Sequence, residues 1–331
     1  MFTIILTVLR QGIVQGIPIL LGSTGEIITE KSGNLNLGIP GLMYMGGISG
    51  LMSAFMYERA ITAAGGIPVP IVGFLISFFF ALLVAAAGAF VFSFLTISLR
   101  ANQNVVGLAL TTFGIGFGNF FGGSISKLAG GVGQISVATT ASAYQKTIPF
   151  LSEIPFFGTV FFSYGFLTYF AIILAFAVAF FLLKTRAGLN LRSIGENPAA
   201  ADSAGINIEK YKYIGTVCGG AIAGLGGLYF VMEYLGGTWN NNGFGDRGWL
   251  AVALVIFALW DSRKAILGAM LFGFLYVLPQ NIPGISRSAK ELFKMSQYLI
   301  TIIVLVFASI RNQKENQAPE KLGVPFFRED R

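Results

Sequence analysis

The sequence predicts an all-α polytopic membrane protein with about nine transmembrane helices, between eight and ten. Of its 331 residues 54% are hydrophobic, 32 are Phe and only 11% are charged, and the mean hydropathy is +0.73. This composition excludes an ordinary soluble domain. Apolar stretches recur as far as residue 310, so residues 1–310 are predicted to form one membrane domain. Residues 311–331 mix Lys, Arg, Asp and Glu and are predicted to form a solvated, partly disordered tail.

Nine apolar stretches are candidates for these helices, because a membrane span needs roughly 20 apolar residues. They lie at residues 5–28, 36–57, 69–98, 102–123, 158–183, 213–233, 249–261, 264–282 and 289–310. The third is long enough to tilt within the bilayer or project from it, whereas the seventh is too short to cross alone if it is straight. The ninth begins with Ser288 and Glu291, which have the spacing of a capping box at a helix start.

Glycine spacing predicts close contacts between helices. The sixth stretch repeats small residues every four positions, at Gly215, Gly219, Ala223 and Gly227. Residues at this spacing share one helix face, and small side chains let helix backbones approach closely in lipid. Tight packing is the plainer interpretation, and faces that slide during transport are the alternative.

The distribution of Lys and Arg predicts the side of the membrane on which each end of the chain lies. Nine spans place the two ends on opposite sides. With the tail inside, the inner segments hold 14 Lys and Arg and the outer segments hold 7, with Arg247 among the outer ones. Because cytoplasmic segments are normally richer in both residues, the sequence predicts a cytoplasmic C-terminus, an external N-terminus and a cytoplasmic polar segment at residues 184–212.

That polar segment carries the signals of a short, well-defined helix. Asn197 suits the N-cap and Pro198 the first helical turn. Ala200 and Ala201 continue the helix, and Gly205 suits a left-handed stop. A capped helix between basic flanks is a candidate docking surface for a soluble partner. A solvated loop with an incidental helix is the alternative.

Motifs along the chain also resemble one family. The pattern Gly-Glu-Asn-Pro-x-Ala-Ala-x-x-x-Gly-Ile at residues 195–206 is similar to the coupling segment of bacterial ABC-importer permeases of the branched-chain amino acid, ribose and nucleoside type. Residues 33–47 resemble the family's N-terminal signature, and residues 104–111 its third-loop motif. Residues 248–257 and 266–273 resemble its C-terminal signature. The pattern is most similar to the shorter permease of nucleoside or simple-sugar importers.

The resemblance implies an importer permease bundle, in which residues 1–310 form the transmembrane permease domain and residues 184–212 couple it to an ATPase. It also implies four partners in a bacterial cytoplasmic membrane. These are ABC ATPase subunits that bind ATP and Mg, a second permease (non-identical, or another copy), an extracytoplasmic solute-binding protein, and membrane lipid. The residues assigned to ATPase coupling are Arg192, Gly195, Glu196, Asn197, Pro198, Ala200, Ala201 and Gly205.

Composition and motifs exclude several kinds of chemistry. The chain has no His, which removes imidazole metal sites and Ser-His catalysis, and Cys218 lies in an apolar stretch where packing is its expected role. The chain lacks a Gly-x-x-x-x-Gly-Lys-Ser/Thr motif. We therefore expect a transport subunit and not an enzyme, with no cofactor or metal of its own. The net charge of +7 is scattered over loops and tail, which does not indicate nucleic-acid binding.

Two Gly- and Asn-rich interruptions of apolar helices are candidates for the solute path, because broken helices commonly form transport sites. The first contains Asn34 and Asn36. The second contains Trp239, Asn240 and Phe244, whose rings could stack on a sugar or base. An interfacial turn and an external loop are the respective alternatives. The predicted path also includes Thr111, Thr112, Asn119 and Glu233. Interhelical hydrogen bonding is the alternative for the first three, and contact with water for Glu233.

The few charges in the predicted spans favour a neutral solute. Glu26 and Glu233 lie near membrane depth, but no cluster of buried acids is expected. This argues against an ion-coupled secondary transporter, which is the main alternative from another class. An intramembrane enzyme has no nucleophile–base pair to support it. A nucleoside is favoured as solute, with a simple sugar, riboflavin or a branched-chain amino acid as alternatives.

Overall fold

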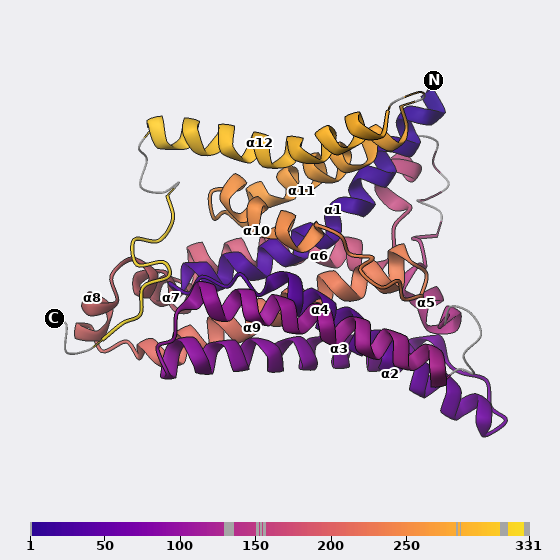
Figure 1. Ribbon diagram of the computed structural model, residues 1–331, viewed down its shortest axis with the longest axis horizontal. Helices are drawn as coiled ribbons and strands as arrows, with labels where there is room; N and C mark the ends of the chain where they lie inside the picture. Colours follow the sequence, from indigo (N-terminus) through magenta and orange to yellow (C-terminus); the bar gives the residue numbers. More distant parts are fainter. Residues whose placement is uncertain are drawn as a thin grey trace.

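The computed structural model describes residues 2–128, 136–149, 152, 154, 157–282, 284, 286–311 and 317–327. These residues form helices and connecting segments, with one isolated β-bridge between Ser136 and Thr238. In Figure 1 the long helices run side by side, with α12 along one edge of the bundle and α2 and α3 along the other. The predicted all-α membrane fold is confirmed.

The helices fall into long and short elements. The long helices are α1 (Phe2–Lys31), α2 (Ile39–Ala63), α3 (Pro70–Ser93), α4 (Gln103–Leu128), α6 (Phe166–Lys184), α9 (Ile208–Tyr229), α11 (Ser262–Val277) and α12 (Arg287–Arg311). The short helices are α5 (Ala138–Tyr144), α7 (Arg186–Glu196), α8 (Pro198–Ser203) and α10 (Arg247–Phe257). Short helical turns extend three of the long helices: η1 (Phe94–Ser98) follows α3, η4 (Phe230–Tyr234) follows α9, and η5 (Leu278–Gln280) follows α11. A fourth turn, η3 (Gly158–Phe162), precedes α6.

Seven helices within the described residues are long and apolar enough to cross a membrane. They correspond to the first six and the eighth of the predicted stretches. The seventh stretch forms α10, which has 11 residues and is shorter than a span, as expected. The ninth forms the 25-residue helix α12. The predicted stretches are therefore all helical, although the count of nine complete spans is not confirmed.

Two helices start at positions other than those predicted. The helix expected from residue 158 is interrupted after η3, and α6 starts only at Phe166, because Gly165 has an extended backbone; a Cβ atom at Gly165 would overlap the Tyr144 carbonyl. The cap of α12 is Ser286 and not Ser288, since the Ser286 hydroxyl accepts a hydrogen bond from the Ala289 amide at 3.2 Å.

The central helix is α1, and 89% of its most apolar stretch is buried inside the protein. It packs mainly against α9 and α11. A Cβ atom added to Gly25 would overlap the Gly219 carbonyl, and one added to Gly227 would overlap the Met43 carbonyl. The predicted close packing of the small-residue face of α9 is confirmed, because backbones and not side chains meet at these contacts.

The first Asn-rich interruption enters the bundle, whereas the second is buried at Trp239 and Phe244 and exposed at Asn240. Residues 32–38 connect α1 to α2, and Ile39 at the start of α2 lies beside Gly22 of α1. The chain has therefore turned back along α1. Residues 235–246 lead into α10, where Gly248 packs against Pro40. The starts of α2 and α10 thus meet inside the bundle, which is the arrangement of broken helices seen in many transporters.

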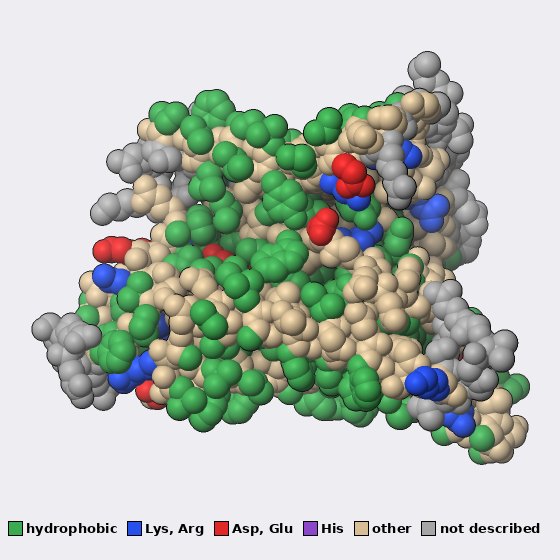
Figure 2. All heavy atoms as spheres, viewed as in Figure 1, with side chains coloured by type: hydrophobic (Ala, Val, Ile, Leu, Met, Phe, Trp, Pro, Cys, Tyr) green, Lys and Arg blue, Asp and Glu red, His purple; other side chains and the backbone are tan. Residues whose placement is uncertain are grey.

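The two ends of the bundle carry different elements. One end holds α7, α8 and residues 317–327, and we call it the α7–α8 end; the start of α1 and α5 lie at the opposite end (Figure 1). Between the ends, apolar side chains cover much of the visible face (Figure 2). Phe79, Phe176 and Phe180 are among the exposed rings. Exposed apolar surface on this scale suits contact with lipid.

Candidate coupling surface and solute path

The α7–α8 segment is built from local capping interactions. The Thr185 hydroxyl accepts from the Gly188 amide at 3.0 Å and caps α7. The Asn197 Oδ1 atom accepts from the Ala200 amide at 3.0 Å and caps α8, with Pro198 in its first turn. Gly205 follows α8 with a φ of +79°, in the left-handed region. The predicted cap, first turn and stop are therefore confirmed as local structure.

Only part of the predicted coupling segment faces outward. Pro198 and Ala201 are buried, and Ala201 packs in a small apolar cluster with Ile194 and Ile208. By contrast, the exposed residues are Glu196, Asn197, Ala200 and Gly205. Pro198 and Ala201 therefore hold α8 onto its own chain, and the contact of this helix with a partner stays a prediction for its exposed side.

Arg192 is half-buried and lines a cavity of about 550 Å³ together with Glu196 and Asp261. Burial acts to raise the pKa of Asp261, but hydrogen bonds and charge from Arg263 outweigh it and hold that pKa below its usual value. The two side chains lie 2.8 Å apart. Asp261 therefore stays ionised and caps α11, whose Arg263 amide donates to it at 2.9 Å.

Gly195 joins the coupling segment to the end of α1 through backbone contact. A Cβ atom added there would lie 2.5 Å from the Lys31 carbonyl oxygen and 3.2 Å from the Gly33 amide. The Gly195 carbonyl accepts from the Lys321 amide at 3.0 Å, and the Gly33 carbonyl accepts from the Gly323 amide at 3.1 Å. The tail thus ties α7 to the turn after α1.

The described part of the tail, residues 317–327, is partly packed: six of its eleven residues are exposed, as expected of a solvated tail, and the others lie against the bundle. Pro319 is buried, Leu322 packs against the main core, and Phe326 packs against the cluster behind α8. The Phe327 ring stacks on the Arg100 guanidinium at 4.4 Å. The apolar run from Leu322 to Phe327 is the sequence signal for this packing. The residues that this run packs against lie far away in the sequence, and the sequence near residues 322–327 does not indicate which they are.

The first interruption is held by hydrogen bonds from three helices. The Asn34 amide donates to Thr216 at 2.9 Å, and the Thr111 hydroxyl donates to the Leu37 carbonyl at 2.6 Å. The Asn36 backbone amide donates to the Glu26 carboxylate at 2.9 Å. Asn34 and Asn36 are fully buried. Thr111 forms the interhelical hydrogen bond that was its alternative, whereas Asn34 and Asn36 lie in a buried turn between helices. Their place in a solute path stays a prediction.

Buried acids are more numerous than expected. Glu26 and Glu30 lie one turn apart on α1 and are both buried, and the Trp260 indole donates to Glu30. The expectation of no buried acid cluster is therefore wrong. Both carboxylates accept hydrogen bonds from groups that close the bundle, the Asn36 amide and the Trp260 indole, which gives them a structural role.

The second interruption forms a buried aromatic cluster. Trp239 and Phe244 are 8% and 2% exposed, and the Phe244 ring lies 4.5 Å from the rings of both Tyr44 and Phe230. Asn240 is exposed beside this cluster. The rings of Trp239 and Phe244 therefore pack within the protein, and they could stack on a solute only if they moved.

Two of the remaining path residues lie at the surface of α4. The Thr112 side chain is exposed, and its hydroxyl donates to the Leu108 carbonyl of its own helix. The Asn119 side chain is half-buried and exchanges hydrogen bonds with Asn242, at 2.9 Å and 3.2 Å. Several cavities occur in the described part of the chain, and four of them, of about 420–550 Å³, are lined by other residues than the predicted path residues.

Arg247 is buried inside the bundle, although the charge count placed it in an outer loop. It is 4% exposed, and its guanidinium donates to the Gln15 side chain at 2.6 Å and to the Phe244 carbonyl at 2.9 Å. The Phe230 and Tyr276 rings lie on it, each at 4.6 Å. Its charge holds the start of α10 in place and says nothing about topology.

Glu233 acts as a cap supplied from another helix. Its carboxylate accepts from the Leu167 amide at 2.6 Å and from the Thr168 hydroxyl at 3.2 Å. Both donors belong to the first turn of α6, where amides lack partners within the helix. The sequence suggested a path residue or contact with water, whereas the structure shows a tertiary hydrogen-bond acceptor.

Comparison with known proteins identifies the family. A model of the permease component of branched-chain amino acid transport systems matches residues 8–305. The chain belongs to this permease family. It is 32% identical over 297 residues to the nucleoside ABC transporter permease protein NupC of Lactococcus lactis, with 87% of each chain covered. No solved structure matches it.

Two further relatives cover nearly all of this permease. The guanosine ABC transporter permease protein NupQ of Bacillus subtilis is 31% identical over 324 residues, which are 96% of this chain and 95% of that one. The putative glucose ABC transporter permease protein TsgC13 of Haloferax volcanii is 30% identical over 318 residues, with 89% of each chain covered. The predicted family resemblance is confirmed.

The role of Glu233 can be tested by substitution. We expect Glu233→Ala to lower the free energy of unfolding by about 1–3 kcal/mol, because buried donors of α6 lose their acceptor. Glu233→Gln should cost less, since it keeps one acceptor. Glu291→Ala is the control, because Glu291 is exposed and pairs only with Lys294. Thermal unfolding of the purified permease measures all three. A Glu233→Gln variant with normal stability and no uptake would instead support a role in the path.

Proposed function

We propose that this permease is the membrane subunit of an ABC importer that carries a nucleoside, using ATP and Mg bound by partner ATPase subunits. The observation that carries the proposal is similarity over nearly the whole chain to permeases named for nucleosides and for guanosine. The similarity to a permease named for glucose makes a simple sugar the second candidate.

The ATPase docks on the exposed side of α8, at Glu196, Asn197 and Ala200. This placement is supported by the construction of the segment: α8 is capped at its start and backed by the buried Pro198 and Ala201. A partner that pushes on such a helix moves it as a unit. The backbone contact of Gly195 with Lys31 and Gly33 then passes the movement to α1 and the first interruption.

The α7–α8 end is placed in the cytoplasm of a bacterial cell, with the membrane domain in its cytoplasmic membrane. Basic residues support this side, since Lys184, Arg186, Arg192 and Lys210 all lie in or beside α7 and α8. The packed tail lies at the same end (Figure 1), so it is cytoplasmic as well. An extracytoplasmic solute-binding protein would then meet the opposite end.

The solute path forms between this permease and a second, non-identical permease. Trp239 and Phe244 are buried within one chain, whereas Thr112 and Asn240 are exposed. A groove of about 520 Å³ between α2, α3 and α4 is lined by apolar residues such as Met52, Phe80 and Phe117. A partner packed against α4 would cover this groove, and Thr112, which lies on another face of the same helix, would need a separate contact with it.

Docking on α8 predicts a selective loss of coupling. We expect Ala200→Trp to abolish co-purification of the ATPase and ATP-driven uptake, because the large ring blocks the exposed face of α8. The variant should still reach the membrane in normal amounts. Ala138→Trp is the matched control, since Ala138 is an exposed alanine at the opposite end. Normal ATPase binding by the Ala200→Trp variant would contradict this docking surface.

The sidedness predicts a labelling pattern in intact cells. After Cys218 is replaced by Ser, a cysteine at exposed Glu320 should resist a membrane-impermeant thiol reagent, and one at Ala138 should react. Labelling of both positions after the membrane is opened shows that each cysteine is accessible. The reverse pattern in intact cells would put α8 outside and remove it from any ATPase.

The solute predicts a competition result. In cells that carry the complete importer, excess guanosine or adenosine should inhibit uptake of a labelled nucleoside, and leucine should not. Arg247, the buried cation beside the second interruption, is already engaged with Gln15 and the Phe244 carbonyl, so it is not available to bind the carboxylate of an amino acid. Inhibition by glucose alone would favour the sugar candidate, and inhibition by leucine alone would exclude a nucleoside.

A further inference from the structure

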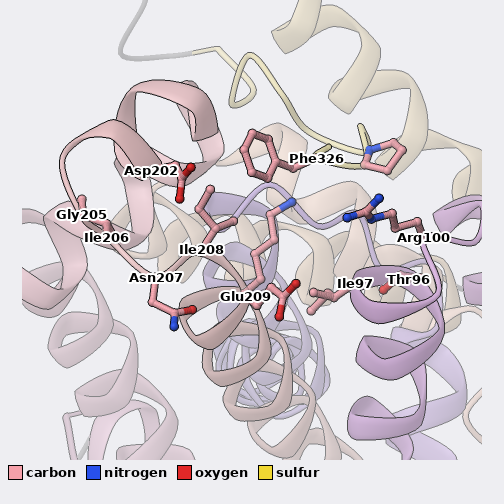
Figure 3. Close-up of a pocket in the computed structure, with 12 residues that line it drawn as sticks. Thr96, Ile97, Arg100, Asp202, Gly205, Ile206, Asn207, Ile208, Glu209 and Phe326 are labelled. Carbon is pink, nitrogen blue, oxygen red and sulfur yellow. The ribbon is translucent and has the colours of Figure 1, made fainter. Parts of the chain in front are cut away.

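A polar cavity of about 540 Å³ lies at the α7–α8 end, beside α8 (Figure 3). Its walls come from three parts of the chain: the end of the α3 extension with Arg100, the segment from Asp202 to Lys212, and tail residues Pro325 and Phe326. It adjoins the proposed docking face but contains none of Glu196, Asn197 and Ala200. The cavity is therefore a separate feature that lies next to the proposed docking face on α8.

Lys212 is the unusual residue of this cavity. Its side chain is only 5% exposed, yet it forms no ion pair within 4 Å among the described residues. Glu209 lies one turn earlier on α9 and also lines the cavity, but it is exposed and does not pair with Lys212. The ammonium faces the cavity with most of its side chain out of water and without a counter-charge in the described part of the chain, which is unfavourable, and an anion that enters the cavity would supply the missing partner.

A second cation faces the same cavity from the opposite wall. Arg100 points toward Phe326 in Figure 3, and its backbone has a φ of +56°, which is rare for a residue with a side chain. Phe327 stacks on its guanidinium at 4.4 Å. The tail thus helps to hold Arg100 at the cavity, and the left-handed backbone of Arg100 ends the helical extension of α3.

The charges around the cavity distinguish between kinds of anion. Asp202 and Glu209 also line it and are partly or fully exposed. They repel a phosphate group, which carries more negative charge than a carboxylate. The mixed charges of the cavity suit a protein segment in which one acidic side chain is flanked by basic or amide groups. The acidic side chain complements the two cations, and the flanking groups complement Asp202 and Glu209.

We propose that an acidic side chain of the partner ATPase enters this cavity and pairs with Lys212 and Arg100. The proposal rests on the proposed function, since it adds a second contact beside the α8 face. The tail has a positioning role in it: Phe326 walls the cavity and Phe327 orients Arg100.

The test measures the affinity of the ATPase subunit for the membrane-reconstituted permease assembly at low and high salt. We expect Lys212→Met and Arg100→Met each to weaken binding about tenfold or more and to reduce its salt dependence, because a desolvated charge pair is lost. Lys210→Met is the matched control, since Lys210 is exposed on the same helix and does not line the cavity. It should change affinity less than about twofold.

Stability of the free permease separates this contact from a folding role. Lys212→Met should leave the melting temperature unchanged or raise it, because an unpaired buried charge has been replaced by an apolar side chain. If Lys212→Met does not accumulate in the membrane, Arg100→Met at its exposed turn decides the question.

Three outcomes would overturn the proposal. Unchanged affinity in Lys212→Met and Arg100→Met, with loss of binding in Ala200→Trp, would leave the α8 docking face intact and reject the cavity contact. Stabilisation of the wild type but not Lys212→Met by inorganic phosphate, with unchanged ATPase affinity, would assign a small-anion site instead. Normal binding by all three variants would reject the α8 docking surface as well.

Discussion

Backbone polar groups at membrane depth must find partners within the protein, and the interruption between α1 and α2 makes the bundle depend on this constraint. The Leu35 amide donates to Gln103 at 2.7 Å, the Asn36 amide donates to Glu26, and the Leu37 carbonyl accepts from Thr111. The partners come from α1 and α4, so those helices cannot separate from the start of α2 without leaving backbone groups unpaired. The polar side chains of Gln103, Glu26 and Thr111 therefore act here as hydrogen-bond partners of the backbone.

The same constraint explains why glycines occupy the helix contacts. Hydrogen bonds between helices are short, so the helices that supply them must pack closely. Gly25 against Gly219 and Gly46 against Gly224 leave no space for a Cβ atom. Such contacts resist small distortions, since there are no flexible side chains to rearrange. If a partner displaces the α7–α8 end, as proposed above, we expect the displacement to pass along α1 as a rigid movement.

Local signals allowed much of the fold and part of the site to be predicted. The helices followed from apolar length, and α8 followed from Asn197, Pro198 and Gly205, because caps depend on neighbours within a few residues. The roles of Glu233 and Arg247 did not follow, since their partners are Leu167 and Gln15. A single sequence does not show which distant backbone amide or amide side chain a buried charge will meet. Trp239 and Phe244 illustrate the same limit, because aromatic residues suit both packing and solute stacking.

The packing of the tail has a consequence for the way the protein folds. Residues 317–327 lie far from Gly195 and Gly33 in the sequence, yet they donate hydrogen bonds to the carbonyls of both residues and complete the wall beside α8. Without these contacts, the segment from α7 to α9 lacks part of its support. Every apolar helix can therefore be in place while the surface at the α7–α8 end is still unfinished, which makes this contact a step of folding separate from the insertion of the helices.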